Sequence, residues 1–302
     1  MIEIKGVSKR FGDFLALDNV SFNIRNGEIV GYVGLNGAGK TTTIRIAVGV
    51  LQPDQGDVLI NGYSIVHDKR RASRYIGWVP EQPIFEPDAK ALDYFVYLAG
   101  YYGYSASEAR SLGKKLLEEV GLGNALYKKL KEYSQGMKKR FALAVSMINN
   151  PDNYLFDEVL NGLDPQGIAF FRDLAVKFRK EGYAVLFSSH ILSEVENIAD
   201  RVVFIHKGRI IREMNIEEIR ALIKPILKIK VDRVDDRIKA ILDKYGIINI
   251  KAREKIVLIE EPSTDSSEIV GVLVKNGYRV EEVSMVKSSL EKVFFKIIGE
   301  ER

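Results

Sequence analysis

One segment, GLNGAGKT at residues 34–41, constrains this chain more than any other. It fits the pattern GxxxxGK[ST], in which glycines let a loop curl so that successive backbone N–H groups point at phosphate oxygens. The apolar run 28–33 before it predicts a buried strand. The residues after Thr41 predict a helix, whose positive N-terminal end would face the bound anion. A strand, a glycine loop and a helix in this order predict an α/β domain that binds a nucleoside triphosphate by its phosphates.

The loop supplies most of the candidate nucleotide-binding residues. They are Gly34, Leu35, Asn36, Gly37, Ala38, Gly39, Lys40, Thr41 and Thr42. Lys40 would supply a positive charge to the β- and γ-phosphates, and the Thr41 hydroxyl can ligate Mg²⁺. The alternative is a glycine-rich turn without a ligand. Such turns rarely carry a Lys-Thr pair at this offset, so we expect ATP and Mg²⁺ at this loop.

A second motif lies downstream, where the apolar run 153–156 is followed by Asp157 and Glu158. This is the pattern of a buried parallel strand that brings carboxylates to the C-terminal edge of its sheet. Asp157 is the candidate residue that holds Mg²⁺ through water, and Glu158 is the candidate base that polarises the attacking water. Taken alone, two acids after an apolar run more often mark an ordinary strand end. Together with the phosphate loop, they indicate an ATPase.

The segment YSQGMKKRFALA at residues 133–144 lies between these motifs, and the three together resemble the ABC-type ATPases, the nucleotide-binding subunits of ATP-binding-cassette transporters. The signature of that family is LSGGQ at the start of a helix. This chain keeps its serine and second glycine as Ser134 and Gly136 and differs at positions 133, 135 and 137. The resemblance implies that Ser134 and Gly136 meet the γ-phosphate held by a second subunit. An N-capped amphipathic helix would also explain Ser134 without any ligand.

Three further positions match that family. The segment NGLDP at 161–165 resembles the loop that follows the catalytic Glu and crosses the dimer interface, and it makes Asp164 a candidate nucleotide-binding residue. His190 ends a strand-like run and matches the catalytic histidine that contacts the γ-phosphate. Phe11 occupies the position where the family stacks an aromatic ring on adenine, for which Phe can replace Tyr. The alternatives are a structural His190, and a Phe11 or Phe14 that closes a sheet edge in the core.

The chain departs from the family in the loop that normally carries a glutamine. Counting from Gly77 places Glu81, rather than Gln82, at the glutamine position. A carboxylate oxygen can still ligate Mg²⁺ or bind water, so Glu81 joins Thr41 and Asp157 as a candidate metal ligand. A Glu81 that faces solvent is the alternative.

The amino-acid composition limits the classes of function that this chain could have. The chain has 302 residues, enough for more than one domain, and no Cys for disulfides or thiolate metal sites. Its 45 basic and 41 acidic residues leave a net charge of +4, and Lys138-Lys139-Arg140 on a helix are expected to form a solvated face rather than a nucleic-acid site. No apolar run approaches the ~20 residues of a membrane span, and no signal peptide opens the chain. We therefore expect a cytoplasmic protein, with any membrane pathway in another polypeptide.

Residues 1–215 carry every motif above and form the expected nucleotide-binding domain. Strand patterns alternate with helical ones, which predicts a mixed, largely parallel sheet with an antiparallel β edge formed by the first strands. Residues from about 85 to 150 lack strand patterns and predict a helical subdomain that carries the signature. Its tyrosine-rich stretch, residues 94–102, is either core or, by the family resemblance, a contact with the membrane subunit.

The pattern changes after Lys224-Pro225. Residues 226–302 show the order β-α-β-β-α-β and then a final helix over 289–298, which predicts a small α+β ferredoxin-like domain. Its ending, SSLEKVF at 288–294, resembles the tail of ATPases that serve ABC-2-type exporters, as does the YSxGM form of the signature. The domain contains no catalytic constellation. We expect it to be an accessory domain, either regulatory, dimer-bracing or partner-binding.

These observations predict an ATP-hydrolysing subunit of an ABC transporter, of the ABC-2 exporter type. Its partners would be an integral membrane permease subunit and a second ATPase subunit, either a copy of this chain or a close relative. The protein would then lie peripherally on the cytoplasmic face of the cell membrane. The alternative is a soluble ABC ATPase that acts on nucleic acid or ribosomes, but such proteins usually have two cassettes or a long coiled coil, and the chain shows neither repeats nor sustained heptads. Glu158 argues against a third alternative, a non-hydrolysing regulatory module.

Overall fold

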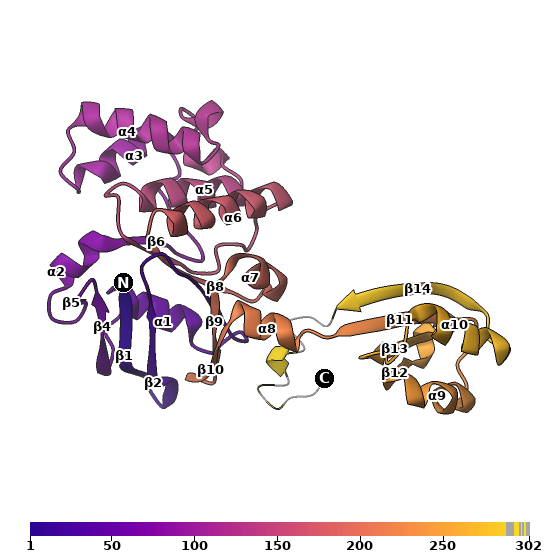
Figure 1. Ribbon diagram of the computed structural model, residues 1–302. Coiled ribbons are helices and arrows are strands. Elements are labelled where there is room, and N and C mark those ends of the chain that lie inside the picture. Colours follow the sequence, from indigo (N-terminus) through magenta and orange to yellow (C-terminus); the bar gives the residue numbers. More distant parts are fainter. Residues whose placement is uncertain (288–292, 296, 298, 300–302) are drawn as a thin grey trace. The chain divides into compact units, whose positions relative to one another are not determined.

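The computed structural model describes residues 1–287, 293–295, 297 and 299 (Figure 1). They form two compact units, Met1–Ile216 and the residues from Glu217 onward, each of which is described by itself. Of the final helix expected over 289–298, residues 293–295 and 297 are helical, and the rest lies outside the described residues. No helix in the described part of the chain is long and apolar enough to cross a membrane.

The first unit is built on a six-stranded mixed sheet in the order β10-β9-β3-β8-β7-β6. Its strands are β3 (Ile29–Val33), β6 (Ile76–Val79), β7 (Asn153–Phe156), β8 (Ala184–Ser189), β9 (Arg201–His206) and β10 (Arg209–Asn215). All neighbours pair in parallel except β10, which pairs antiparallel with β9. Every residue of β3, β7 and β8 is buried, as expected for parallel strands covered on both faces. The prediction of a mixed, largely parallel sheet is confirmed.

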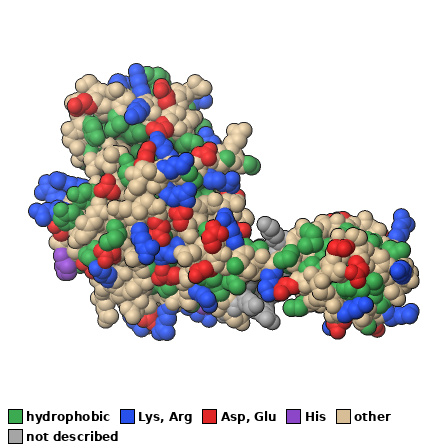
Figure 2. All heavy atoms as spheres, viewed as in Figure 1, with side chains coloured by type: hydrophobic (Ala, Val, Ile, Leu, Met, Phe, Trp, Pro, Cys, Tyr) green, Lys and Arg blue, Asp and Glu red, His purple; other side chains and the backbone are tan. Residues whose placement is uncertain are grey.

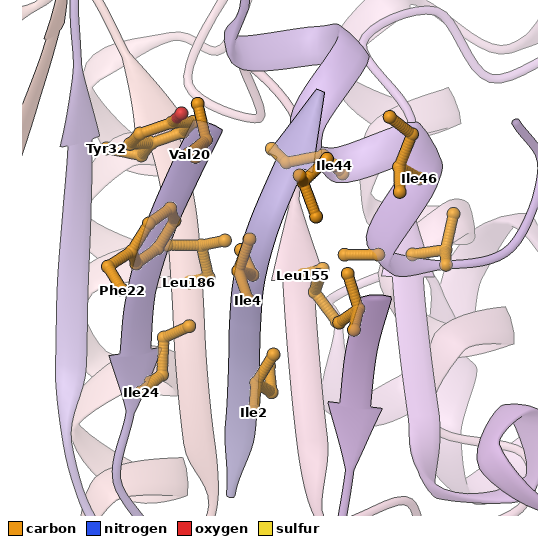
Figure 3. Close-up of a cluster of buried hydrophobic side chains, with 14 of the residues drawn as sticks. Ile2, Ile4, Val20, Phe22, Ile24, Tyr32, Ile44, Ile46, Leu155 and Leu186 are labelled. Carbon is orange, nitrogen blue, oxygen red and sulfur yellow. The ribbon is translucent and has the colours of Figure 1, made fainter. Parts of the chain in front are cut away.

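A second, four-stranded antiparallel sheet has the order β2-β1-β4-β5 and confirms the antiparallel edge. Its strands are β1 (Ile2–Phe11), β2 (Phe14–Ile24), β4 (Gln55–Ile60) and β5 (Tyr63–Ser64). Alternate side chains of β1 and β2, among them Ile4 and Phe22, share one buried cluster with Ile44 of α1 (Lys40–Ala47) and with Leu186 of the mixed sheet (Figure 3). This common core fixes α1, and with it the loop that precedes the helix.

Helices make up the region expected to be helical. They are α3 (Ala91–Gly100), α4 (Ala106–Glu119) and α5 (Gln135–Ser146), which contact one another. A capping box starts α4, in which Ser105 Oγ accepts from the Glu108 N–H and the Glu108 carboxylate accepts from the Ser105 N–H. The tyrosine-rich stretch is only partly core, because Phe95 is fully buried whereas Tyr97 and Tyr101 are 56% and 73% exposed.

The remaining helices of the first unit are α2 (Lys69–Ala72), α6 (Pro165–Lys180) and α7 (Leu192–Ile198). Asp164 starts α6 as its N-cap, accepting a 2.7 Å hydrogen bond from the Gly167 N–H, and Pro165 occupies the first helical position. Helix α6 contacts β8, and α7 contacts β3.

The second unit begins within α8 (Ile216–Leu222) and continues with a four-stranded antiparallel sheet in the order β12-β13-β11-β14. Its elements are β11 (Pro225–Val231), α9 (Asp236–Leu242), β12 (Ile247–Lys251), β13 (Ile256–Glu260), α10 (Ser266–Lys275) and β14 (Val280–Lys287). Leu227, Ile259 and Leu273 belong to its own buried core. This connectivity is the ferredoxin-like order, and the α+β prediction is confirmed.

Candidate functional site

The phosphate loop lies between β3 and α1, as predicted, and its glycines are sterically required. Gly37 and Gly39 have φ angles of +78° and +112°, which L side chains rarely adopt. A Cβ on Gly34 would lie 2.4 Å from the Ile205 carbonyl oxygen, and one on Gly39 would lie 2.6 Å from Leu17 Cδ2. Glycine at these positions therefore lets the loop lie directly against β9 and β2.

Lys40 is 5% exposed, and its side chain folds back over the loop. Its Nζ donates to the Gly34 carbonyl at 2.8 Å and to the Leu35 carbonyl at 3.3 Å. The same nitrogen lies 3.3 Å from Glu158 Oε1. The Lys40 ammonium group therefore lies between the loop carbonyls and the Glu158 carboxylate. A phosphate oxygen could replace that carboxylate as its partner.

An open pocket of about 400 Å³ lies over the loop. It is lined by Phe11, Phe14, Ala16, Asn36, Gly37, Gly39, Lys40, Thr41, Thr42, Glu81, Glu158, Asn161 and His190. Strands distant in the sequence thus bring the loop together with Phe11, Glu81, Glu158 and His190, as the sequence predicted. Phe11 and Phe14 are 49% and 62% exposed at this pocket, so neither ring is buried in the core.

Asp157 lies at the carboxyl end of β7, next to the loop. Its Oδ1 accepts hydrogen bonds from Thr41 Oγ1 at 3.1 Å and from Ser188 Oγ at 2.9 Å. Burial raises the pKa of Asp157, while these two hydrogen bonds act to lower it and the nearby Glu81 and Glu158 charges act to raise it. A buried carboxylate in this environment would be stabilised by a cation.

Glu158 has each of its polar backbone and side-chain atoms in contact with a partner. Its Oε2 lies 2.9 Å from His190 Nδ1 and accepts from Asn161 Nδ2 at 3.2 Å, and its N–H donates to Ser188 Oγ at 2.9 Å. Its backbone has a φ of +46°, an uncommon value for a residue with a side chain. Residues held in such conformations cluster at functional sites, because the surrounding structure must compensate for the strain.

The expectation for Lys139 was wrong. It was predicted on a solvated face of its helix, but it is 5% exposed and donates a 2.6 Å hydrogen bond to the Glu158 carbonyl oxygen. Burial lowers the pKa of Lys139 to about 8, although the carboxylates of Glu158, Glu81 and Asp157 act to raise it. A run of three basic residues does not reveal which one faces inward. That depends on how α5 is rotated against the rest of the unit.

Ser134, Gly136 and Asp164 are not among the residues that line the pocket. Ser134 is exposed and caps α5, accepting a 3.2 Å hydrogen bond from the Met137 N–H. Asp164 caps α6 with 67% of its side chain exposed, and Arg140 Nη2 lies 3.8 Å from its Oδ1. Both helix N-termini are therefore accessible for contact from outside the chain.

Sequence reasoning did not include Ser188, Asn161 or Lys139 among the candidate site residues, although all three contact Asp157 or Glu158. For Ser188 a signal existed, because with Ser189 it ends the apolar strand β8, and it is completely buried. A polar side chain in such a run usually has a specific partner.

The oxygen donors of Thr41, Asp157 and Glu81 are the candidate metal ligands. Among the described residues, no group of three His, Asp or Glu side chains could hold a metal ion by itself. Thr41 and Asp157 are nevertheless in contact, and Glu81 lines the same pocket. A hydroxyl with one or two carboxylates suits Mg²⁺ that takes its other ligands from phosphates and water, so the residues present fit Mg²⁺ together with a nucleotide.

Comparison with known proteins identifies the family. Residues 17–161 match the family described as ABC transporter. The chain is 34% identical to the uncharacterized ABC transporter ATP-binding protein YhcH of Bacillus subtilis (strain 168), over 99% of this chain and 96% of that protein. It is 30% identical to the bacitracin transport ATP-binding protein BcrA of Bacillus licheniformis, over 99% and 97% of the two chains. The chain belongs to the ABC transporter ATP-binding proteins.

Further similar proteins support the same family assignment for this ABC ATPase. It is 36% identical to the Nod factor export ATP-binding protein I of Burkholderia lata, over 70% of each chain. Its structure resembles that of the ATP-binding cassette MJ0796, a dimer in a post-hydrolysis state bound to ADP and Pi, with 25% identity, a TM-score of 0.64 and coverage of 72% of this chain and 99% of that one. The predictions of an ABC cassette and of an ATPase subunit are confirmed.

The alternative of an ATPase acting on nucleic acid gains no support from these relatives, which are named for transport or export. The surface agrees on the face that Figure 2 shows, where basic and acidic side chains are interspersed rather than gathered by sign. A strong nucleic-acid site would need a basic patch or stripe.

Proposed function

We propose that two copies of this ABC ATPase, or one copy and a close relative, bind ATP between them and drive an integral membrane permease subunit that exports its substrate. The observation that carries this proposal is the separation of the two anion sites. The phosphate loop and Glu158 line one pocket, whereas Ser134, at the exposed start of α5, does not line it. Each pocket would then be completed by Ser134 and Gly136 of a second subunit, with Asp164 at the same interface.

In this proposal the loop amides and Lys40 hold the phosphates, and Phe11 stacks on the adenine. Phe11 is exposed at the pocket, as a stacking ring must be. Thr41, Asp157 and Glu81 would hold Mg²⁺, which withdraws charge from the phosphate oxygens when it is bound.

Glu158 orients the attacking water and removes its proton, since its carboxylate faces the pocket. Its partner is His190, which lies 2.9 Å from Glu158 Oε2 and is half exposed at the pocket. From there His190 can also reach a γ-phosphate. Asn161 fixes the same carboxylate oxygen from the other side.

Dimerisation can be tested directly. Glu158→Gln should hold ATP without turning it over, and in saturating Mg-ATP this variant should be dimeric by light scattering, whereas the nucleotide-free protein should be mainly monomeric. Ser134→Arg in the same background should prevent the dimer, because a large cation at the α5 N-terminus would obstruct contact there. A monomer of Glu158→Gln under saturating Mg-ATP would contradict a homodimer and favour an obligate heteromeric partner.

Export is proposed because one relative is named for Nod factor export, and because the YSxGM signature resembles that of ABC-2-type exporters. The proposal places the protein peripherally on the cytoplasmic face of the cell membrane. Exposed Tyr97 and Tyr101 would contribute to the contact with the permease, since aromatic side chains are enriched at protein interfaces. If a neighbouring gene encodes about six apolar spans, co-expression of its product should bring the ATPase into the membrane fraction, and Tyr101→Glu should reduce that recovery. If as much ATPase is recovered in the membrane fraction without the neighbouring gene product, that product is not its permease partner.

We also propose that residues 226–302 form an accessory domain that regulates the ATPase or braces its dimer. The second unit has its own buried core, and every nucleotide motif precedes it. A chain truncated after residue 225 should therefore bind ATP with the affinity of the full chain, and any change should appear in dimerisation or turnover. A folded truncated chain that cannot bind ATP would refute the division of the chain into a nucleotide-binding domain and an accessory domain.

A further inference from the structure

The buried cation Lys139 is not used by the mechanism above. It lies on α5, the helix that Ser134 caps, and its Nζ donates to the backbone carbonyl of Glu158 at 2.6 Å. Lys139 therefore connects the helix that carries the signature with the backbone of the residue proposed as the base. Lys138, its neighbour on the same helix, is only half-buried.

The backbone of Glu158 needs such support. With a φ of +46° it lies in the left-handed region, which is unfavourable for a residue with a side chain. Its N–H is held by Ser188 Oγ, and its carbonyl accepts from both Lys139 Nζ and the Asn161 N–H. A charge-assisted hydrogen bond is among the stronger contacts available for holding a peptide unit in a strained conformation.

A purely structural role explains the lysine less well. Burying an ammonium group is costly, and an apolar side chain of similar length usually fills such a position at equal or better stability. The carboxylates of Glu158, Glu81 and Asp157 are near enough for their charges to act to raise the pKa of Lys139. The ammonium group is therefore held against the backbone of Glu158, a residue that lines the pocket.

We infer that Lys139 is a positioning residue for ATP hydrolysis, which holds the Glu158 backbone so that its carboxylate stays between Lys40 and His190. The inference rests on the proposed role of Glu158 as the base. Lys139 does not touch the reacting atoms in this role; it acts through the peptide unit of Glu158. Without it, the carboxylate would sample orientations away from the pocket, and turnover would fall while nucleotide binding remained.

The test uses the full-length chain and Lys139→Met, which keeps the length of the side chain and removes the donor. We expect kcat for ATP to fall by about tenfold to hundredfold, the range for loss of a hydrogen bond to a charged group. KM and the affinity for a fluorescent ATP analogue should stay within about twofold, and the melting temperature should be unchanged or higher. Lys138→Met, one residue away, is the matched control and should keep the wild-type kcat. Lys139→Leu, which also lacks a donor, is the second variant and is judged by the same criteria if the Met variant does not fold.

The double variant Lys139→Met, Glu158→Gln separates this inference from the function on which it rests. With the base already removed, the Lys139 substitution should cause no further loss in single-turnover hydrolysis. Wild-type kcat in both Lys139 variants beside an inactive Glu158→Gln would overturn the inference and leave the proposed function standing. The inference would also be overturned if Lys139→Met lowered the single-turnover rate of Glu158→Gln by the same factor as it lowers that of the wild type. Normal turnover in Glu158→Gln would instead refute the role of Glu158.

Discussion

Replacement of Glu158 by Gln tests the centre of the proposed mechanism. The amide keeps the shape of the side chain but cannot take a proton from water. A positioned base contributes about 10²–10⁴-fold to a rate, so kcat should fall by at least about 100-fold, or about 2.7 kcal/mol in the barrier. ATP binding should not weaken. Glu158 Oε1 lies 3.3 Å from Lys40 Nζ, an attraction of about 5 kcal/mol at an effective dielectric constant of about 20, before desolvation is subtracted. Without this competing anion, Lys40 is more available to the phosphates, so affinity should be equal or higher.

Two measurements decide this prediction. Phosphate release at saturating Mg-ATP gives kcat, and calorimetry at a temperature where turnover is negligible gives the affinity for ATP. Glu118→Gln, an exposed carboxylate on α4, is the matched control and should behave like the wild type in both. A Glu158→Gln protein that turns over within a few-fold of the wild-type rate would refute the assignment of the base. A loss of ATP affinity equal to the loss of rate would show that Glu158 serves binding rather than the chemical step.

Lys40→Ala should weaken ATP binding itself, because its cation lies over the phosphate loop; unchanged affinity by calorimetry would show that the loop is misassigned. Glu81→Ala should impair hydrolysis more than Gln82→Ala, because Glu81 lines the pocket and its charge acts on Asp157, and Glu81→Gln should make activity less dependent on Mg²⁺. ATPase titrations against Mg²⁺ test this, and a larger defect in Gln82→Ala would show that Gln82, rather than Glu81, occupies the glutamine position. Burial lowers the pKa of Lys139 from 10.5 to about 8, so between these values the unfolded chain binds more protons and stability rises with pH. Urea unfolding of the wild type relative to Lys139→Met should therefore show a gain of at most about 3 kcal/mol between pH 8 and 10, and a flat or falling difference would contradict the burial of this charge.

Much of the site could be predicted because its determinants are local. A glycine loop between a strand and a helix encodes its own curvature, and Lys40 and Thr41 follow at fixed offsets on the first turn of α1. Asp164-Pro165 marks the start of α6 in the same way, through a side-chain cap and a proline at the first helical position. The ferredoxin-like order of the second unit followed from period-2 and helical patterns in sequence.

Only the tertiary structure decided which residues far apart in the chain contact one another. Ser188 reaches Asp157 and Glu158 only because β7 and β8 are neighbours in the mixed sheet. Lys139 was expected in solvent, and the rotation of α5 turned it inward to the Glu158 carbonyl. The sequence by itself determined that this chain has a phosphate loop, a strand ending in two acids and a second small domain, since each depends on near neighbours in the chain. How Glu158 is held was decided by the packing of α1, α5 and the neighbouring strands β7 and β8, because side-chain partners across such distances leave no periodicity in the sequence.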